Sequence, residues 1–321
     1  MERPRFQTSP YAYKVVWGSA IALVAVLSAG VWGLLHDMYS STRADSERGL
    51  RSFVERQQPA MNRLIGSIDL LLFSVEDILR LTGTPVTEQD PADLQNVLQM
   101  TVKQDALISS IAIVQLDGKV LASADSLGNY RLEQIPRNWL QGIAQMQGKE
   151  RMLRISTPDA SWAQMRVLHI ARALNTASGI PVFVVAQVPL SSWIGVLVQG
   201  STLNGLEVTL ERADGSRVLR VPSDAERTES YRAAALAEQL PQGVQNGFSR
   251  LDGAPAMLEV VPLNYDGLRL TAAVPLTTVF QHWYATRNAV LLGALLFSLL
   301  LLGGAALMQV YLRRMQRAQQ Q

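Results

Sequence analysis

The residues of this chain that could do chemistry are suited to binding a ligand rather than to catalysis. Guanidinium groups hold carboxylates or phosphates through charge-assisted hydrogen bonds, and aromatic rings stack on flat ligands. The candidate ligand-binding residues lie in the middle of the chain and are Tyr130, Arg137, Trp139, Trp162, His169 and Arg172. No residue is assigned a catalytic role, because the sequence offers no defensible pair of nucleophile and base.

Each candidate also has a plain structural interpretation. Arg137 follows Pro136 in a predicted loop, where it is either a ligand clamp or a solvated surface arginine. Trp139 either stacks on a ligand or closes a core. Tyr130 and Trp162 sit in polar connections, where aromatic residues line binding sites or anchor loops.

His169 and Arg172 lie three residues apart in a run that alternates like a β-strand. Side chains three apart in a strand point to opposite faces of the sheet, so at most one of the two can face a given pocket. The alternative for His169 is a hydrogen-bonded core histidine.

Composition excludes several classes of site. The chain has no cysteine, which removes disulfides and thiolate chemistry together. Its only histidines are His36, His169 and His282, so no histidine cluster exists to bind zinc, and neither a metal nor a cofactor is predicted. The net charge of +2 argues against nucleic acid as a partner.

Two uncharged apolar runs bracket the chain, Val15 to Leu35 and Ala289 to Val310. About 20 apolar residues in a helix span the hydrocarbon core of a bilayer, so each run predicts a transmembrane helix. A cleaved signal peptide is the alternative for the first run. Val31 to Leu35 continue that run past the small residues Ser28 to Gly30, which favours an uncleaved anchor.

Basic residues flank both runs on their outer sides in the sequence, namely Arg3, Arg5, Lys14, Arg313, Arg314 and Arg317. Such residues stay in the cytoplasm. The sequence therefore predicts a two-pass membrane protein, with both termini cytoplasmic and the block between the spans on the outer side of the membrane.

A long helical pattern follows the first run. Met61, Ile68 and Val75 repeat every seven residues beside a second row that includes Leu64 and Leu71. This stripe either packs against its own domain or forms a homodimer seam, and the two can hold on different parts of the helix. Pro59 is a candidate kink, and the pattern ends at Gly83-Thr84-Pro85.

Two stretches then repeat the same order of strands 97 residues apart. The first begins with the run 111–116, an Asp117-Gly118 turn and a returning strand, and the second begins with 208–212 and Asp214-Gly215. We expect an α+β fold with two tandem units, each an antiparallel sheet with helices packed on it. Arg220, Arg250 and Tyr231 of the second unit do not group in the sequence, and Glu211 with Asp214 makes no convincing acid–base pair, so this unit is expected to be a mechanical adaptor.

The predicted organisation runs from a cytoplasmic N-terminus to the start of a signalling helix. In order, it comprises the N-terminus (1–14), transmembrane helix 1 (15–35), a long stalk helix (40–82), a membrane-distal unit (83–190), a connector helix (191–203), a membrane-proximal unit (204–287), transmembrane helix 2 (289–310) and the first turns of a cytoplasmic helix (311–321).

This order of elements resembles the double Cache sensor domain, built from PAS-like units, of bacterial transmembrane receptors. The resemblance rests on segments that include IAIVQLDGKVLAS at 111–123, HIARAL at 169–174 and VTLERADGSRVLRVP at 208–222. It implies a small-molecule pocket in the membrane-distal unit and a signalling output such as a diguanylate cyclase, histidine kinase or chemoreceptor.

In members of this family that bind amino acids, an Arg-x-Trp-Tyr motif holds the ligand carboxylate and a later aspartate holds the amine. Arg137 and Trp139 match the motif, but Leu140 replaces its tyrosine and the strand 182–188 contains no aspartate. The resemblance thus argues against an α-amino acid. An anionic ligand is compatible with Arg137, Arg166 and Arg172, the last of which falls in a slot that is often polar in the family.

Three functions follow from these patterns. The first is an extracytoplasmic sensor that passes ligand occupancy through the second span to an output domain lying beyond Gln321. The second is a complete membrane-anchored adaptor that acts through a partner protein. The third is a periplasmic hydrolase on a stalk, which would need a catalytic base where the sequence offers only His169.

Overall fold

The computed structural model describes residues 12–81, 86, 89–126, 135, 137–144, 153–156, 167–174, 181–212, 215–222, 243–265 and 267–319. The chain divides into two compact units. One contains both ends of the chain, Met1–Ser46 and Thr277–Gln321, and the other contains Glu47–Leu276.

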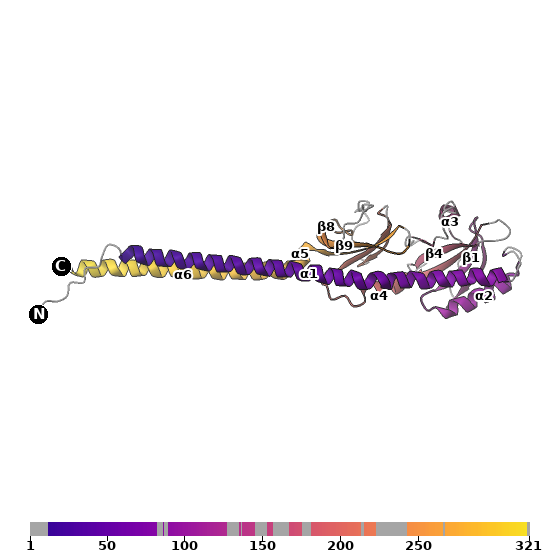
Figure 1. Cartoon of the computed structure of the whole chain (residues 1–321), viewed down its shortest axis with the longest axis horizontal. Coiled ribbons are helices and arrows are strands. Elements are labelled where there is room, and N and C mark those ends of the chain that lie inside the picture. The colour runs from indigo at the N-terminus through magenta and orange to yellow at the C-terminus, as the bar shows by residue number, and fades with distance from the viewer. Residues whose placement is uncertain are drawn as a thin grey trace. The chain divides into compact units, whose positions relative to one another are not determined.

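The unit that contains the chain ends is a pair of apolar helices (Figure 1). It consists of the first part of α1 (Ala12–Leu81), the short helix α5 (Leu276–Val279) from Thr277 onward, and α6 (Gln281–Gln319). Near one end of the pair, Trp17 Nε1 donates to Gln309 Oε1 at 2.9 Å. Near the other, the rings of Tyr39 and Phe280 stack with centroids 4.7 Å apart. These contacts hold α1 and α6 side by side.

Large apolar side chains point outward along both helices. Trp32 is 71% exposed and Leu300 is 74% exposed, and most of their apolar neighbours are similarly uncovered. By length and composition, each helix could cross a membrane. The two apolar helices expected at the ends of the sequence are therefore present.

In the other unit, α1 buries one stripe of apolar residues against the domain. The stripe repeats at helical spacing and consists of Leu50, Phe53, Val54, Met61, Leu64, Ile65, Ile68, Leu72, Val75 and Leu79. Pro59 lies inside the helix without ending it. The packing of the stripe against its own domain, one of the two interpretations of the heptad pattern, is thus observed.

Next along the chain is α2 (Pro91–Gln104), which packs on the first sheet. Its start is fixed by local chemistry: Asp90 caps the helix by accepting a hydrogen bond from the Ala92 amide at 2.8 Å, and Pro91 takes a first-turn position that needs no backbone donor.

The first sheet has five antiparallel strands in the order β2-β1-β5-β4-β3. The strands are β1 (Ser110–Gln115), β2 (Val120–Asp125), β3 (Arg154–Ile155), β4 (Val167–Leu174) and β5 (Val182–Pro189). The second sheet repeats the order as β7-β6-β10-β9-β8, with β6 (Glu207–Arg212), β7 (Arg217–Val221), β8 (Gln245–Phe248), β9 (Pro255–Pro262) and β10 (Leu268–Pro275).

The two sheets share an irregularity as well as an order. A register shift falls between Ile113 and Val114 in the first hairpin and between Leu210 and Glu211 in the second, at equivalent positions of the repeat. The expected α+β fold with two tandem antiparallel sheets is confirmed.

The first hairpin turns as its sequence predicts. Asp117 Oδ1 accepts a hydrogen bond from the Lys119 amide at 2.9 Å, and Gly118 has a φ of 90°. A Cβ at position 118 would also lie 2.7 Å from the Ile135 carbonyl oxygen, so only glycine fits. Asp214, the equivalent turn residue of the second hairpin, lies outside the described residues.

Between the sheets, α4 (Leu190–Val198) forms the connector, buried through Leu190, Trp193 and Leu197. The helix ends at Val198, earlier than the expected 203, because Gly200 adopts a φ of 72°, which a helix cannot contain. The limits assigned to the two α/β units stay predictions.

Candidate ligand-binding site

The first sheet carries a small core on the face opposite α1, under the helix α3 (Arg137–Ala144) (Figure 1). Its buried members are Ala112, Val114, Ile135, Leu140, Ile143, Ala171, Phe183 and Val185. Leu140, which stands where the family motif has tyrosine, is fully buried here. Trp139 is half-buried and packs against the same core.

A chain of neutral polar groups borders this core. Ser110 Oγ lies 2.6 Å from Gln187 Oε1, and Gln187 Nε2 lies 3.0 Å from His169 Nε2. On its other side, His169 Nδ1 lies 3.4 Å from Ser156 Oγ. The chain thus links strands β1, β5 and β4 to the residue after β3.

The network assigns the protons. The hydroxyl of Ser110 donates to Gln187 Oε1, so the amide nitrogen of Gln187 faces the imidazole and donates to His169 Nε2. His169 is then neutral with its hydrogen on Nδ1, directed at Ser156. Ser156 Oγ also accepts the backbone amide of His169 at 2.9 Å.

The described contacts of His169 differ from those of the histidine in a serine hydrolase. A serine nucleophile needs an imidazole nitrogen that accepts its proton, and a third group, usually a carboxylate, that orients the ring. His169 instead presents a hydrogen to Ser156, and its far nitrogen meets the donating amide of Gln187. The pair is better described as part of a hydrogen-bonded wall.

The structure brings together two of the six predicted site residues. The rings of Trp139 and His169 lie edge to face with centroids 6.2 Å apart, on α3 and β4. Arg137 is the first residue of α3 and is exposed. Tyr130 and Trp162, as well as Arg166, lie outside the described residues.

Arg172 belongs to the opposite face of β4. Its Nη1 donates to Asp69 Oδ1 on α1, and its Nε lies 3.6 Å from Glu76 Oε2. The guanidinium also sits over the ring of Phe73, 5.1 Å from the centroid. As the strand alternation predicts, His169 and Arg172 face opposite sides. Arg172 fastens the sheet to α1.

Sequence reasoning missed Ser110, Ser156, Gln187 and the carboxylates Asp69 and Glu76. Gln187 does leave a signal, since it is a lone polar residue in the apolar strand 182–188. Asp69 and Glu76 leave another, because two carboxylates seven residues apart share one face of a helix beside the apolar stripe.

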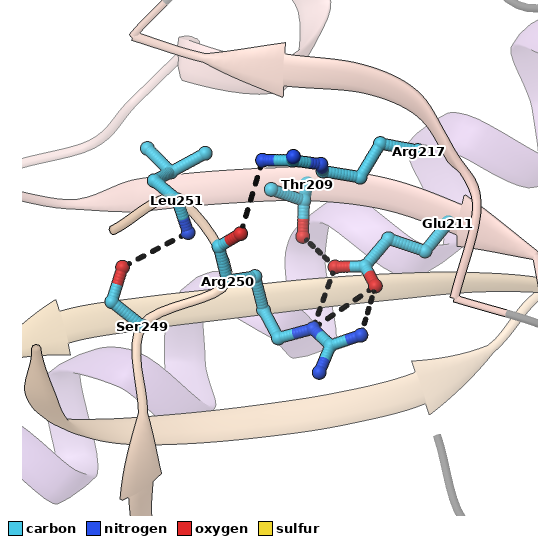
Figure 2. A network of polar contacts seen from close by, with 6 residues as sticks. All are labelled: Thr209, Glu211, Arg217, Ser249, Arg250 and Leu251. Carbon is cyan, nitrogen blue, oxygen red and sulfur yellow. Dashed lines mark hydrogen bonds and ion pairs between the residues drawn. The ribbon is translucent and has the colours of Figure 1, made fainter. Parts of the chain in front are cut away.

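The second sheet contains a buried ion pair, drawn in Figure 2. Glu211 on β6 is fully buried and meets Arg250 through three contacts, of which the closest joins Arg250 Nη2 to Glu211 Oε2 at 2.6 Å. Thr209 Oγ1 donates to Glu211 Oε1 at 2.5 Å. Arg250 thus pairs with Glu211, a partner that sequence reasoning did not identify.

The same network secures the turn between β8 and β9. Arg217 Nη1 on β7 donates to the Arg250 carbonyl at 3.2 Å, and Ser249 Oγ donates to Glu207 Oε2 on β6 at 2.5 Å (Figure 2 shows Arg217, Ser249 and Arg250). Ser249 Oγ in turn accepts the Leu251 amide at 3.0 Å. The turn is thus tied across the sheet to β6 and β7.

A side-chain hydrogen bond connects the second sheet to the edge of the first. The guanidinium of Arg212, at the end of β6, donates through Nη2 to the backbone carbonyl of Ile155 on β3. Ile155 directly precedes Ser156, whose hydroxyl belongs to the polar chain around His169. The contact with the second sheet is therefore made by the residue next to Ser156 in the sequence, and Ser156 belongs to the wall of the candidate site.

Solved structures share this fold. The periplasmic sensory domain of the Campylobacter jejuni chemoreceptor Tlp1 matches with a TM-score of 0.56 and 13% identity, covering 74% of this chain and 98% of that one. The ligand-binding domain of the Pseudomonas aeruginosa amino acid chemoreceptor PctB, in complex with L-Arg, matches with a TM-score of 0.54 and 15% identity over 76% and 94% of the two chains.

A third match is the extracellular domain of rpHK1S-Z16, a protein described as a histidine kinase, with a TM-score of 0.54, 17% identity and coverage of 72% and 95%. No protein-family model and no curated protein sequence matches the chain. At such identities the matches establish the fold alone. The domain between the two apolar helices has the double Cache fold of the extracytoplasmic sensory domains of bacterial transmembrane receptors.

Proposed function

We propose that this chain is the ligand-sensing input part of a two-pass receptor in the bacterial inner membrane. A small molecule binds in the first α/β unit, and its occupancy alters the α1–α6 helix pair and thereby a cytoplasmic output. A diguanylate cyclase or a histidine kinase fits this role. The observation that carries the proposal is the double Cache fold held between two exposed apolar helices.

The site is the face of the first sheet beneath α3. Trp139 offers an aromatic surface beside the core, and the polar chain from Ser110 to Ser156 supplies a wall of side chains that are held in place by hydrogen bonds to one another. Such walls favour binding because few groups must be ordered when the ligand arrives. Arg137, at the start of α3, is near enough in sequence to contribute from the rim.

The outward-facing apolar side chains of α1 and α6 support membrane insertion. Val26 and Leu300 are more than two-thirds exposed, at 71% and 74%, which in water would be an unusually large apolar surface. Basic residues beyond the apolar runs favour cytoplasmic termini and a periplasmic sensory domain. Trp17 and Trp283, at opposite ends of the pair, match the aromatic belts of membrane helices.

Two connections offer a route for the signal. The first is the chain itself: β10 is followed directly by the four-residue helix α5, and Phe280 alone separates α5 from α6. The second connection is Arg212, which contacts β3 beside the candidate site. A ligand that prefers one arrangement of these elements shifts the equilibrium toward it.

We also propose that two copies of the chain form a homodimer through the stalk part of α1. On α1, Leu70, Ile78 and Leu81 remain exposed at 71%, 42% and 87%, beside the stripe that packs against the domain. Ile78 continues the row of Leu64 and Leu71, and the spacing of Leu70 and Leu81 places them beside that row on the same side of the helix. This exposed row supports pairing of two copies through the stalk.

The test is a thermal unfolding screen of the full chain in lipid nanodiscs. The panel contains carboxylates, their neutral amides, amines, amino acids and purines. A ligand at about 100 times its Kd adds about 2.7 kcal/mol of stability, which raises the unfolding temperature by about 5 °C or more. We expect Trp139→Ala to abolish this shift and Trp32→Ala, in the apolar run, to preserve it.

Two results would contradict the proposal. One is the absence of a shift for every compound in the panel. The other is a shift that survives in Trp139→Ala as fully as in Trp32→Ala, which would place the binding site elsewhere in the chain.

A further inference from the structure

Arg154 is a charged residue on the α3 face of the first sheet. It lies on the edge strand β3 directly opposite Ala171 of β4, and Ala171 belongs to the core under α3. Residues directly opposite each other in an antiparallel pair point to the same face. Arg154 therefore shares the face of Trp139 and His169, whereas Arg172 faces α1.

The guanidinium of Arg154 lies against α3 at Gly142. A Cβ at position 142 would come within 2.6 Å of Arg154 Nη1 and within 3.3 Å of the guanidinium carbon. Gly142 has an ordinary helical backbone, so glycine is not needed there for its conformational freedom. Its lack of a side chain instead leaves space for a neighbouring group. The glycine makes room for the cation under the helix.

Arg154 Nη1 is buried and has no hydrogen-bond acceptor among the residues that the structure describes. A guanidinium cannot lose its charge to relieve this, and a buried donor without an acceptor is costly. Arg172 is a buried structural arginine in the same sheet, and its guanidinium is paired with the carboxylates of Asp69 and Glu76. No such partner faces Arg154 in the described part of the chain.

Around Arg154, the described side chains of this face are neutral: they are the apolar core and the chain Ser110, Gln187, His169 and Ser156. Among the described residues, a carboxylate does share the face, because Asp125 on β2 stands directly opposite Ser110, but β2 and β3 are the two outer strands of the sheet, so Asp125 lies at the far edge from Arg154. The half-buried guanidinium of Arg154 is therefore complementary to one negative charge. A carboxylate matches the two-pronged hydrogen-bonding geometry of a guanidinium.

We infer that Arg154 is the anchoring residue for the carboxylate of a small monoanionic ligand, and that Gly142 keeps the space in which that contact forms. The inference rests on the proposed function and names the ligand class for the same site. Trp139 and the neutral polar wall contact the remainder of the ligand.

The test uses the full chain in nanodiscs and a set of matched probes: acetate, propionate, butyrate, lactate and benzoate, each beside its neutral amide. We expect at least one carboxylate to raise the unfolding temperature and its amide to leave it unchanged. In Arg154→Gln, the affinity for that carboxylate falls about 30-fold or more, as for truncation of one partner of a buried charge pair. In Gly142→Ala it falls about 10-fold, because the methyl group displaces the guanidinium.

Stability without a ligand separates binding from structure. An arginine without a buried partner adds no ion pair to the fold, so the unfolding temperature of ligand-free Arg154→Gln stays equal to or above that of the parent chain. The matched control, Arg172→Gln, lowers it. If Arg154→Gln lowers it as much as Arg172→Gln does, Arg154 is structural and the inference is wrong.

The remaining outcomes are distinct. Binding of amides as tightly as carboxylates, or carboxylate binding that Arg154→Gln leaves intact, overturns the role of Arg154. Shifts caused only by cationic amines, purines or other compounds without a carboxylate, and lost in Trp139→Ala, also overturn it but keep the proposed function. No shift with any compound overturns both.

Discussion

The side-chain amide of Gln187 lies 3.0 Å from Nε2 of His169, and its oxygen lies 2.6 Å from the hydroxyl of Ser110. Gln187 therefore satisfies a donor on one strand and an acceptor on another at the centre of the candidate site. The orientation of its amide decides which nitrogen of His169 carries the proton. A single glutamine thus sets the polarity of the wall that a ligand would meet.

Replacing Gln187 with alanine should destabilise the domain. The change leaves the Ser110 hydroxyl and His169 Nε2 without these partners in a buried place, which costs about 1–3 kcal/mol. At about 2–4 °C per kcal/mol, thermal unfolding of the full chain should show the loss clearly. Ser109→Ala, which removes a hydrogen bond to the Gln187 backbone carbonyl, is the control and should cost less. Equal unfolding temperatures for Gln187→Ala and the parent chain would show that the network contributes nothing.

Arg172→Met should be among the most damaging single substitutions in the chain. It leaves Asp69 and the buried Glu76 without the guanidinium between α1 and β4, and breaking a buried pair costs about 3–5 kcal/mol. Arg80 also pairs with Glu76, at 3.4 Å, but its side chain is 56% exposed. Arg80→Ala should therefore cost less than about 1 kcal/mol. Similar losses for both variants in thermal unfolding would refute the structural role of Arg172.

The Glu211–Arg250 pair should behave differently when one partner or both are replaced. Arg250→Ala leaves the fully buried Glu211 carboxylate uncompensated and should cost about 3–5 kcal/mol. The double variant Glu211→Leu/Arg250→Met replaces the pair with apolar groups of similar size and should recover most of that loss. Unfolding temperatures of the single and double variants make the comparison. A double variant less stable than either single one would contradict it.

Glu259 on β9 gives the fold a pH dependence. Burial raises the pKa of its carboxyl above the ordinary value of 4.5, Arg51 opposes this rise and Glu55 adds to it. Because the folded chain holds this proton more tightly than the unfolded chain, the contribution of Glu259 to stability falls as the pH rises from 4.5 through the raised pKa. Glu259→Gln should therefore be more stable than the parent chain at pH 7 and gain less at pH 4.

The control for this prediction is Glu55→Gln on α1, which removes only the smallest of the three influences on Glu259. Unfolding temperatures are compared at matched pH, so that the titration of all other carboxyl groups cancels. A difference between Glu259→Gln and the parent chain that stays constant from pH 4 to pH 7 would show that the pKa of Glu259 is unshifted.

Much of the fold could be predicted because its signals are local. The alternation in 111–116 and 208–212, together with the Asp-Gly turns, marks hairpins without knowledge of the rest of the chain. The repeat of that pattern then predicts the second sheet from the first. The apolar runs at the two ends are equally local, since length and absence of charge suffice to identify them.

The candidate site was harder to predict because its chemistry depends on distant pairings. Strand alternation shows that His169 and Arg172 face opposite sides, but not which side meets α1. Asp69 lies 103 residues before Arg172, and no local pattern joins them. Arg154 presents the same difficulty, since two residues of edge strand carry no alternation from which to infer a face.

The central claim is that a ligand in the first α/β unit changes the α1–α6 pair. The chain contains no cysteine, so Ser19→Cys on α1 and Met308→Cys on α6, both exposed, accept spin labels at two defined places. Trp17 and Gln309, which join the helices nearby, stay intact. The distance distribution between the labels is measured in nanodiscs with and without the compound that raises the unfolding temperature most. We predict a shift in the populated distances, one that is lost in Trp139→Ala. An unchanged distribution at saturating compound would show that occupancy does not reach the membrane helices.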